Sequence, residues 1–201
     1  MPSSKRAVVV TGFGPFGSHK VNASSVTVKM LEEEGLGNDD VELVVTELPV
    51  AYRDVKDIIP WLWKKYNPLL VVHVGVSGIA TELTLEQLAH NDGYDKHDIH
   101  GMCPSSNNCV DDACDQIIVS GINMEHVCQA VNSSGGAVKA VVSQDPGRYL
   151  CDFSYFTSLH INRSCAAFVH VPPLDMPYSA KDLAEGLRQA INAMLGQVIQ
   201  Q

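Results

Sequence analysis

The sequence predicts an α/β fold: a single-domain α/β/α sandwich with a twisted, largely parallel (mixed) sheet. Apolar runs of strand length alternate with helical patterns along the chain, which is typical of this architecture. Several runs are apolar on both faces, as strands are when helices cover both sides of a sheet. The chain has 201 residues, of which 45% are hydrophobic, and it contains no repeat or linker. We therefore expect one domain over residues 1–201.

The expected elements follow in chain order. Apolar, often β-branched residues predict strands over residues 7–10, 41–45, 47–50, 69–76, 83–88, 117–122, 137–142 and 166–169. Helices are expected between them, over residues 23–35, 52–66, 124–131 and 149–159. A last helix begins at Ser179, where Asp182 completes a variant of the capping box. Its apolar stripe comprises Leu183, Leu187, Ile191, Met194 and Val198.

Charge and cysteine content exclude several classes of partner. A net charge of −9 argues against nucleic acid or an anionic membrane surface as the main partner. The first apolar run is too short for a signal peptide or a membrane span, so we expect a cytoplasmic protein. The six cysteines have irregular spacings, which favours free thiols over a disulfide framework in such a protein.

The first expected strand leads into a glycine-rich turn. Gly12, Gly14 and Gly17 match the G-x-G-x-x-G pattern of dinucleotide-binding folds. The match is weak, because Pro15 disfavours helical backbone at Gly14 and further polar residues delay the next helix. Ser18 also stands where a phosphate-binding loop requires Lys. Nucleotide binding is therefore the weaker alternative.

Phe13 and Phe16 lie in this turn, near the end of a strand. Two aromatic faces there could hold a small flat ligand between them. One or both rings could equally plug the sheet as core residues. The residues alone leave both interpretations open.

Cys151 is the candidate nucleophile. Asp145-Pro146-Gly147 predicts a turn between the strand at residues 137–142 and the helix at residues 149–159, so Cys151 falls in or near the first turn of that helix. Free N–H groups and the helix dipole favour an anion there, and the thiolate is the reactive form of cysteine. His170 follows the strand at residues 166–169 and is the candidate general base. Separately, Cys151 could be an inert core residue and His170 a structural one.

The polar region that follows the expected strand at residues 83–88 carries several residues of types that bind metals in other proteins. They are His90, His97, His100, Cys103, Cys109 and Cys114. Structural zinc sites favour close pairs such as C-x₂-C, and no such pair occurs here. A polar loop without a metal is therefore the expectation. The loop could cover the site as a lid.

Four groups of residues together resemble the pyroglutamyl-peptidase I family, in its vertebrate cytosolic type. They span nearly the whole chain in order and comprise residues 11–17 with 21–24, 75–78 with 84–86, 147–152 and 168–172. The resemblance implies a cysteine omega-peptidase that removes N-terminal pyroglutamate (5-oxoproline) from small peptides. It needs no cofactor or metal. The chain departs from the pattern at Pro146, where relatives carry a small residue.

The same resemblance assigns the site residues. It implies a catalytic triad of Cys151, His170 and Glu86, in which Glu86 orients the imidazole and the thiol forms a thioester. Phe13 and Phe16 resemble the pair that holds the lactam ring, and Val76 belongs to a segment that resembles the lactam-binding strand end. Asn22 also matches a family position, although it could equally cap the following helix.

Two other functions stay open at this stage. One is a nucleotide- or phosphate-binding enzyme that uses the turn at residues 12–17, and the other is a binding protein that captures pyroglutamyl peptides without turnover. The modest length favours a monomer, and a homo-oligomer is the alternative.

Overall fold

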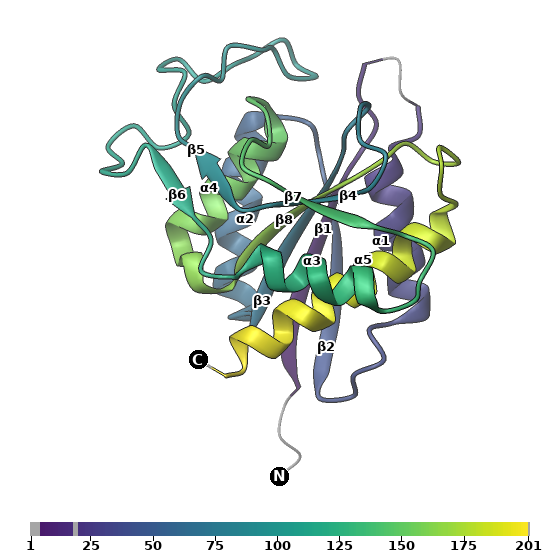
Figure 1. The fold of residues 1–201 in the computed structure, drawn as a ribbon. Coiled ribbons are helices and arrows are strands. Elements are labelled where there is room, and N and C mark those ends of the chain that lie inside the picture. Colours follow the sequence, from purple (N-terminus) through teal and green to yellow (C-terminus); the bar gives the residue numbers. More distant parts are fainter. Residues whose placement is uncertain (1–4, 18–19, 201) are drawn as a thin grey trace.

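A six-stranded mixed sheet forms the centre of the structure (Figure 1). The computed structural model describes residues 5–17 and 20–200. The strand order is β2 (Val41–Leu48), β1 (Arg6–Phe13), β3 (Leu70–Val76), β8 (Ala166–Val171), β4 (Leu83–Glu86) and β7 (Ala140–Ser143). All neighbours are parallel except β4 and β8. The predicted fold class is confirmed.

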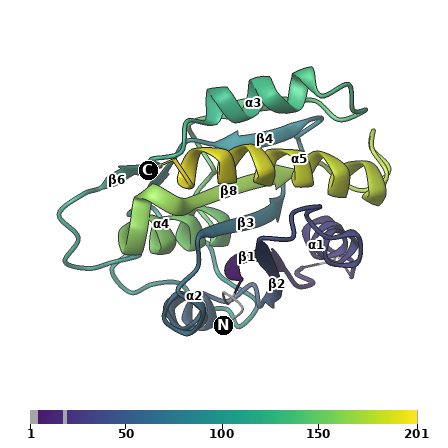
Figure 2. The same ribbon diagram turned by 90° about the horizontal axis from the view of Figure 1, so that it is seen from below.

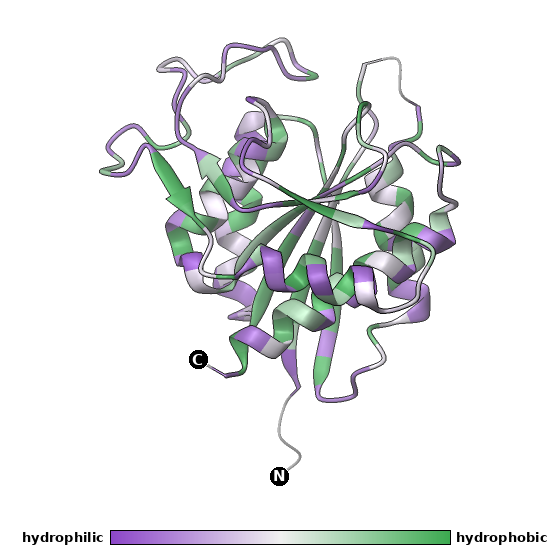
Figure 3. Ribbon diagram, in the orientation of Figure 1, coloured by the Kyte–Doolittle hydropathy of each residue, from purple (hydrophilic) through white to green (hydrophobic). Residues whose placement is uncertain are grey.

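Helices cover both faces of the sheet (Figure 2). One face carries α1 (Ala23–Glu34), α3 (Met124–Ser133) and α5 (Ala180–Val198), and the other carries α2 (Tyr52–Tyr66) and α4 (Leu150–Asn162). Strand β1 shows why both faces must be apolar: Val8 and Val10 pack with α1 and α5, whereas Val9 packs with α2. Hydrophobic residues follow the central strands, while hydrophilic residues dominate the loops (Figure 3).

The final helix forms as the sequence predicts. Ser179 caps α5, and its side chain and that of Asp182 form the reciprocal hydrogen bonds of a capping box. The first four residues of the expected stripe are buried, and Val198 is partly buried against the same core. Of the helices in the described residues, none is long and apolar enough to cross a membrane.

Three strand predictions need correction. The two strands expected at residues 41–45 and 47–50 are one strand, β2, which ends at Leu48. The segment at 137–142 is the short edge strand β7; it has one neighbour, so Val141 is 40% exposed instead of buried. The segment at 83–88 divides, because β5 (Leu88–His90) leaves the main sheet and pairs antiparallel with β6 (Ile117–Val119).

The glycine-rich turn has a packing role in this structure. Gly12 lies within β1, where an added Cβ would lie 2.8 Å from Cγ2 of Val28 and 3.0 Å from the carbonyl oxygen of Ser24, so glycine lets α1 approach the strand. The helix begins at Ala23, well after the glycines. Ser18, which carried the argument against a phosphate-binding loop, lies outside the described residues.

Candidate active site

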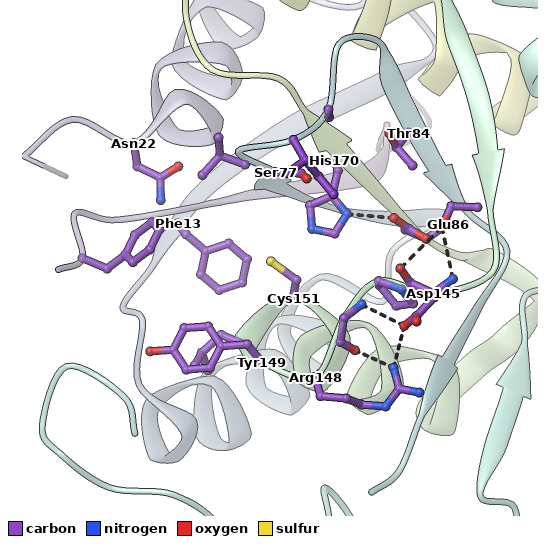
Figure 4. A pocket seen from close by; sticks show the side chains of 18 of the residues that line it. Phe13, Asn22, Ser77, Thr84, Glu86, Asp145, Arg148, Tyr149, Cys151 and His170 are labelled. Atoms are coloured by element: carbon purple, nitrogen blue, oxygen red, sulfur yellow. Dashed lines mark hydrogen bonds and ion pairs between the residues drawn. The ribbon is translucent and has the colours of Figure 1, made fainter. Parts of the chain in front are cut away.

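A pocket of about 600 Å³ opens where β1, β3 and β8 end. Phe13, Val76 and His170 reach it from these strand ends, and Cys151 reaches it from the start of α4. Sites of open α/β sheets form beyond the carboxyl ends of the strands, as expected here. Figure 4 shows Cys151 at the centre of the pocket, between the side chains of Phe13 and Glu86.

Cys151 is the second residue of α4, as predicted. The chain enters the helix through a turn in which the N–H of Gly147 donates to Oδ1 of Asp145 at 3.1 Å, and Gly147 has a φ of +82°. The N-cap residue, Tyr149, makes no side-chain hydrogen bond to the first turn. The N–H groups of that turn therefore have neither an intrahelical acceptor nor an N-cap side chain, and they favour negative charge beside the sulfur.

His170 and Glu86 form a buried pair. Nδ1 of His170 lies 2.8 Å from Oε1 of Glu86, and the residues are 7% and 1% exposed. His170 lies within β8 and not after its end, because the strand continues to Val171. Neighbouring strands hold the imidazole in place, since β8 pairs His170 with Gly75 on β3 and with Thr84 on β4.

The surroundings of His170 favour the imidazolium form. Burial by itself would lower the pKa of His170. Cys151 and Glu86 each contribute a hydrogen bond and a charge interaction that act in the opposite direction, and together they raise the pKa well above the ordinary value of 6.5. A histidine that hydrogen-bonds to both a thiol and a carboxylate can stabilise the thiolate and then donate a proton. Such an arrangement is suited to supply a nucleophile, an acid/base group and an orienting carboxylate.

Comparison with known proteins gives the family of the chain. The family model for pyroglutamyl peptidase matches residues 6–194. The chain belongs to this family. It is 54% identical to pyroglutamyl-peptidase 1 of Rattus norvegicus, over 98% of this chain and 93% of that protein. It is 53% identical to pyroglutamyl-peptidase 1 of Homo sapiens, over 97% of this chain and 92% of that protein.

Solved structures share the fold. A mutant pyrrolidone carboxyl peptidase from Pyrococcus furiosus matches with a TM-score of 0.83 at 22% identity, over 94% of this chain and 98% of that chain. Pyroglutamyl peptidase I from Bacillus amyloliquefaciens matches with a TM-score of 0.83 at 19% identity, over 96% of this chain and 98% of that chain. The chain is thus a cysteine peptidase of the pyroglutamyl peptidase family.

The structure brings the residues predicted to bind substrate to one end of the same pocket. Phe13, Phe16, Val76 and Asn22 all line it. Phe13 is only 3% exposed and packs into the core, as its core interpretation expects, while its contact with a ligand stays a prediction. Asn22 is the N-cap of α1, as its alternative interpretation expects, because its Oδ1 accepts the N–H of Ser24 at 3.0 Å.

The polar segment after β5 forms part of the pocket wall through Lys96. The cysteines of this segment differ in exposure: Cys114 is exposed and Cys103 is partly exposed, whereas Cys109 is buried and its thiol lies 3.2 Å from Oγ1 of Thr157. Within residues 5–17 and 20–200, no group of three or more His, Cys, Asp or Glu side chains is arranged to hold a metal ion.

Sequence reasoning missed the pocket-lining Tyr149 and the close contact of Gly75 with Cys151. Tyr149 lines the pocket beside Phe13, and its hydroxyl donates to the carbonyl of His97 at 3.0 Å (Figure 4). Gly75 lies against the nucleophile, where an added Cβ would be 2.7 Å from Sγ of Cys151. The signal for Tyr149 was its position just before the nucleophile's helix. For Gly75 no local signal exists, because the contact depends on how β3 and α4 meet.

We expect Gly75→Ala to lower kcat by about 10²-fold, since displacing a reacting group by about 1 Å has an effect of this size. The new methyl group would lie 2.7 Å from Sγ of Cys151 and 2.8 Å from Cζ of Phe168, which is fully buried. The ring cannot move far, so the sulfur must. Steady-state kinetics with a pyroglutamyl amide checks this, and Gly196→Ala, where an added Cβ meets nothing within 4 Å, is the matched control. Unchanged kcat in Gly75→Ala would contradict the placement of the sulfur.

Proposed function

We propose that this protein hydrolyses the bond after an N-terminal pyroglutamate of small peptides, and that the chain works as one catalytic domain. The observation that carries the proposal is the Cys151–His170–Glu86 arrangement in a chain that the pyroglutamyl peptidase family matches over residues 6–194. The sheet supports the single domain, because its strands come from residues 6–171 and α5 closes one face.

The proposed reaction begins at the thiolate of Cys151, which attacks the carbonyl carbon of the pyroglutamyl group. N–H groups of the first turn of α4 stabilise the resulting oxyanion. His170, as imidazolium, donates its proton to the leaving amine, and the C–N bond breaks to leave a thioester on Cys151. A water molecule then transfers a proton to His170 as it attacks the thioester. Pyroglutamate is released and the thiolate–imidazolium pair is restored. Glu86 keeps Nδ1 of the ring oriented throughout.

The neutral lactam ring needs an apolar slot with a few polar groups, and the end of the pocket near Phe13 supplies both. The rings of Phe13 and Phe16 with Val76 provide apolar walls. Asn22 donates one N–H of its Nδ2 to the carbonyl of Gly14 at 3.0 Å, so it fixes the turn that carries the two rings. The second N–H of that amide is available to the lactam carbonyl.

The test compares two fluorogenic amides that differ only in the lactam carbonyl, a pyroglutamyl and a prolyl derivative. We expect the enzyme to cleave the first and to prefer it by roughly 10³-fold or more, because a site built to bind a polar group strongly rejects the analogue without it. Equal rates would contradict lactam recognition, and no cleavage of the pyroglutamyl amide by folded, reduced protein would contradict the function. The cytoplasmic location and monomeric state expected from the sequence stay predictions for cell fractionation and sedimentation.

A further inference from the structure

Asp152, the residue after Cys151, is a buried carboxyl group that takes no part in the proposed reaction. Its side chain is 0% exposed, and it is the third residue of α4. Burial raises the pKa of Asp152 to about 7, against the lowering effect of the N–H of His90 and the charge of Arg148. Burying a carboxyl group costs free energy unless its partners compensate, so these partners indicate its role.

The Asp152 carboxyl group joins α4 to β5. Its Oδ1 accepts the backbone N–H of His90, the last residue of β5, at 3.0 Å. Its Oδ2 lies 3.5 Å from Nδ1 of His90 and 3.7 Å from Nη1 of Arg148. The hydroxyl of Tyr94 donates to the carbonyl of His90, and the Tyr94 ring packs edge-on against Phe153 in the next position of the helix.

Arg148 extends this connection to the turn before α4. Its Nη1 donates to Oδ1 of Asp145 and to the carbonyl of Gly147, each at 2.7 Å. Gly93, at a φ of +91°, leaves room for the arginine, because an added Cβ there would lie 3.3 Å from Cγ and Cδ of Arg148. The entry turn, the first turn of α4 and the end of β5 therefore meet at Asp152.

The start of α4, like that of α2, lacks a hydrogen bond from an N-cap side chain, whereas the other three described α-helices have one. The side chains of Asn22, Asn123 and Ser179 cap α1, α3 and α5, but Tyr149 gives α4 no such hydrogen bond. A capping side chain would occupy the N–H groups that the oxyanion needs. An uncapped first turn, however, lacks the bonds that keep it from fraying.

We propose that Asp152 is a positioning residue for Cys151: its Oδ1 binds the backbone N–H at the end of β5 and so fixes the first turn of α4, while the N–H groups of that turn stay free for the substrate. The hydrogen-bond acceptor at Oδ1 is what this role requires, and the negative charge is not. The expected effect of Asp152 on catalysis rests on the proposed function.

The test is the pair Asp152→Asn and Asp152→Ala. Both remove the charge, but only asparagine keeps an acceptor for the N–H of His90. We expect Asp152→Ala to lower kcat per active site by about 10- to 100-fold with little change in KM, and Asp152→Asn to stay within about threefold of wild type. Asp182→Ala is the matched control, because Asp182 is the third residue of α5 and does not line the pocket; its kcat per active site should not change.

A second readout is the rate at which iodoacetamide alkylates Cys151, located by mass spectrometry. We expect Asp152→Ala to react more slowly than Asp152→Asn, since a displaced thiol loses its contact with His170. Wild-type kcat in folded Asp152→Ala, or equal losses in the two variants, would overturn the proposal. If Asp152→Ala does not fold, a loss of tenfold or more in Asp152→Asn overturns it instead. If wild type cleaves no pyroglutamyl amide, the proposed function fails, but the alkylation rates still decide the role of Asp152.

Discussion

Cys151→Ala is expected to lower kcat/KM for a pyroglutamyl amide by about 10⁴-fold or more, which is the usual effect of removing a catalytic nucleophile. The substitution deletes the sulfur that forms the thioester, and no other described cysteine lines the pocket. Cys151→Ser should be almost as inactive. The proposed mechanism needs an ionised nucleophile beside His170, and a serine hydroxyl does not ionise readily enough to take the place of the thiol.

Steady-state hydrolysis of a fluorogenic pyroglutamyl amide measures this loss. Cys114→Ser is the matched control, because this exposed thiol lies outside the pocket and its replacement should leave kcat/KM unchanged. Iodoacetamide should inactivate wild type and the control alike. Activity retained in Cys151→Ala at more than a few per cent of wild type would mean that another group attacks the substrate.

Glu86→Gln should lower kcat by roughly 10²- to 10⁴-fold, as the loss of the carboxylate does in other triads. The buried carboxylate helps to raise the pKa of His170, so its replacement by a neutral amide lowers that pKa. Activity requires the imidazolium form, which is lost as the pH rises through the pKa of His170. The alkaline limb of the pH profile should therefore move to lower pH in the variant.

A pH profile of kcat/KM for wild type and Glu86→Gln tests both parts of this expectation. Glu125→Gln, on the exposed face of α3, is the control for losing one negative charge from the surface. An alkaline limb that stays at the wild-type position in Glu86→Gln would show that this carboxylate does not set the charge of His170.

Local patterns predicted those parts of the site that depend on neighbouring residues in the chain. The turn at residues 145–147 and the position of Cys151 in the first turn of α4 follow from turn and helix chemistry. The cap of α5 by Ser179 follows from side chains three residues apart. Such features need no knowledge of the tertiary structure.

Features that depend on strand register could not be predicted in this way. Glu86 looked like an ordinary surface acid until the family resemblance singled it out, because its contact with His170 depends on β4 running antiparallel to β8. The contact between Gly75 and Cys151 depends on the approach of α4 to β3. Asp152 received no role from the sequence, because its buried contact depends on the position of β5.

The central claim is that Cys151 carries the pyroglutamyl group as a thioester. The most direct measurement mixes the enzyme with an activated pyroglutamyl ester, quenches with acid during turnover and locates the adduct by mass spectrometry. The account predicts a mass increase of one pyroglutamyl group on the peptide that contains Cys151, and none in Cys151→Ala. An adduct on another residue, or wild-type turnover by an enzyme whose Cys151 is fully alkylated, would contradict it.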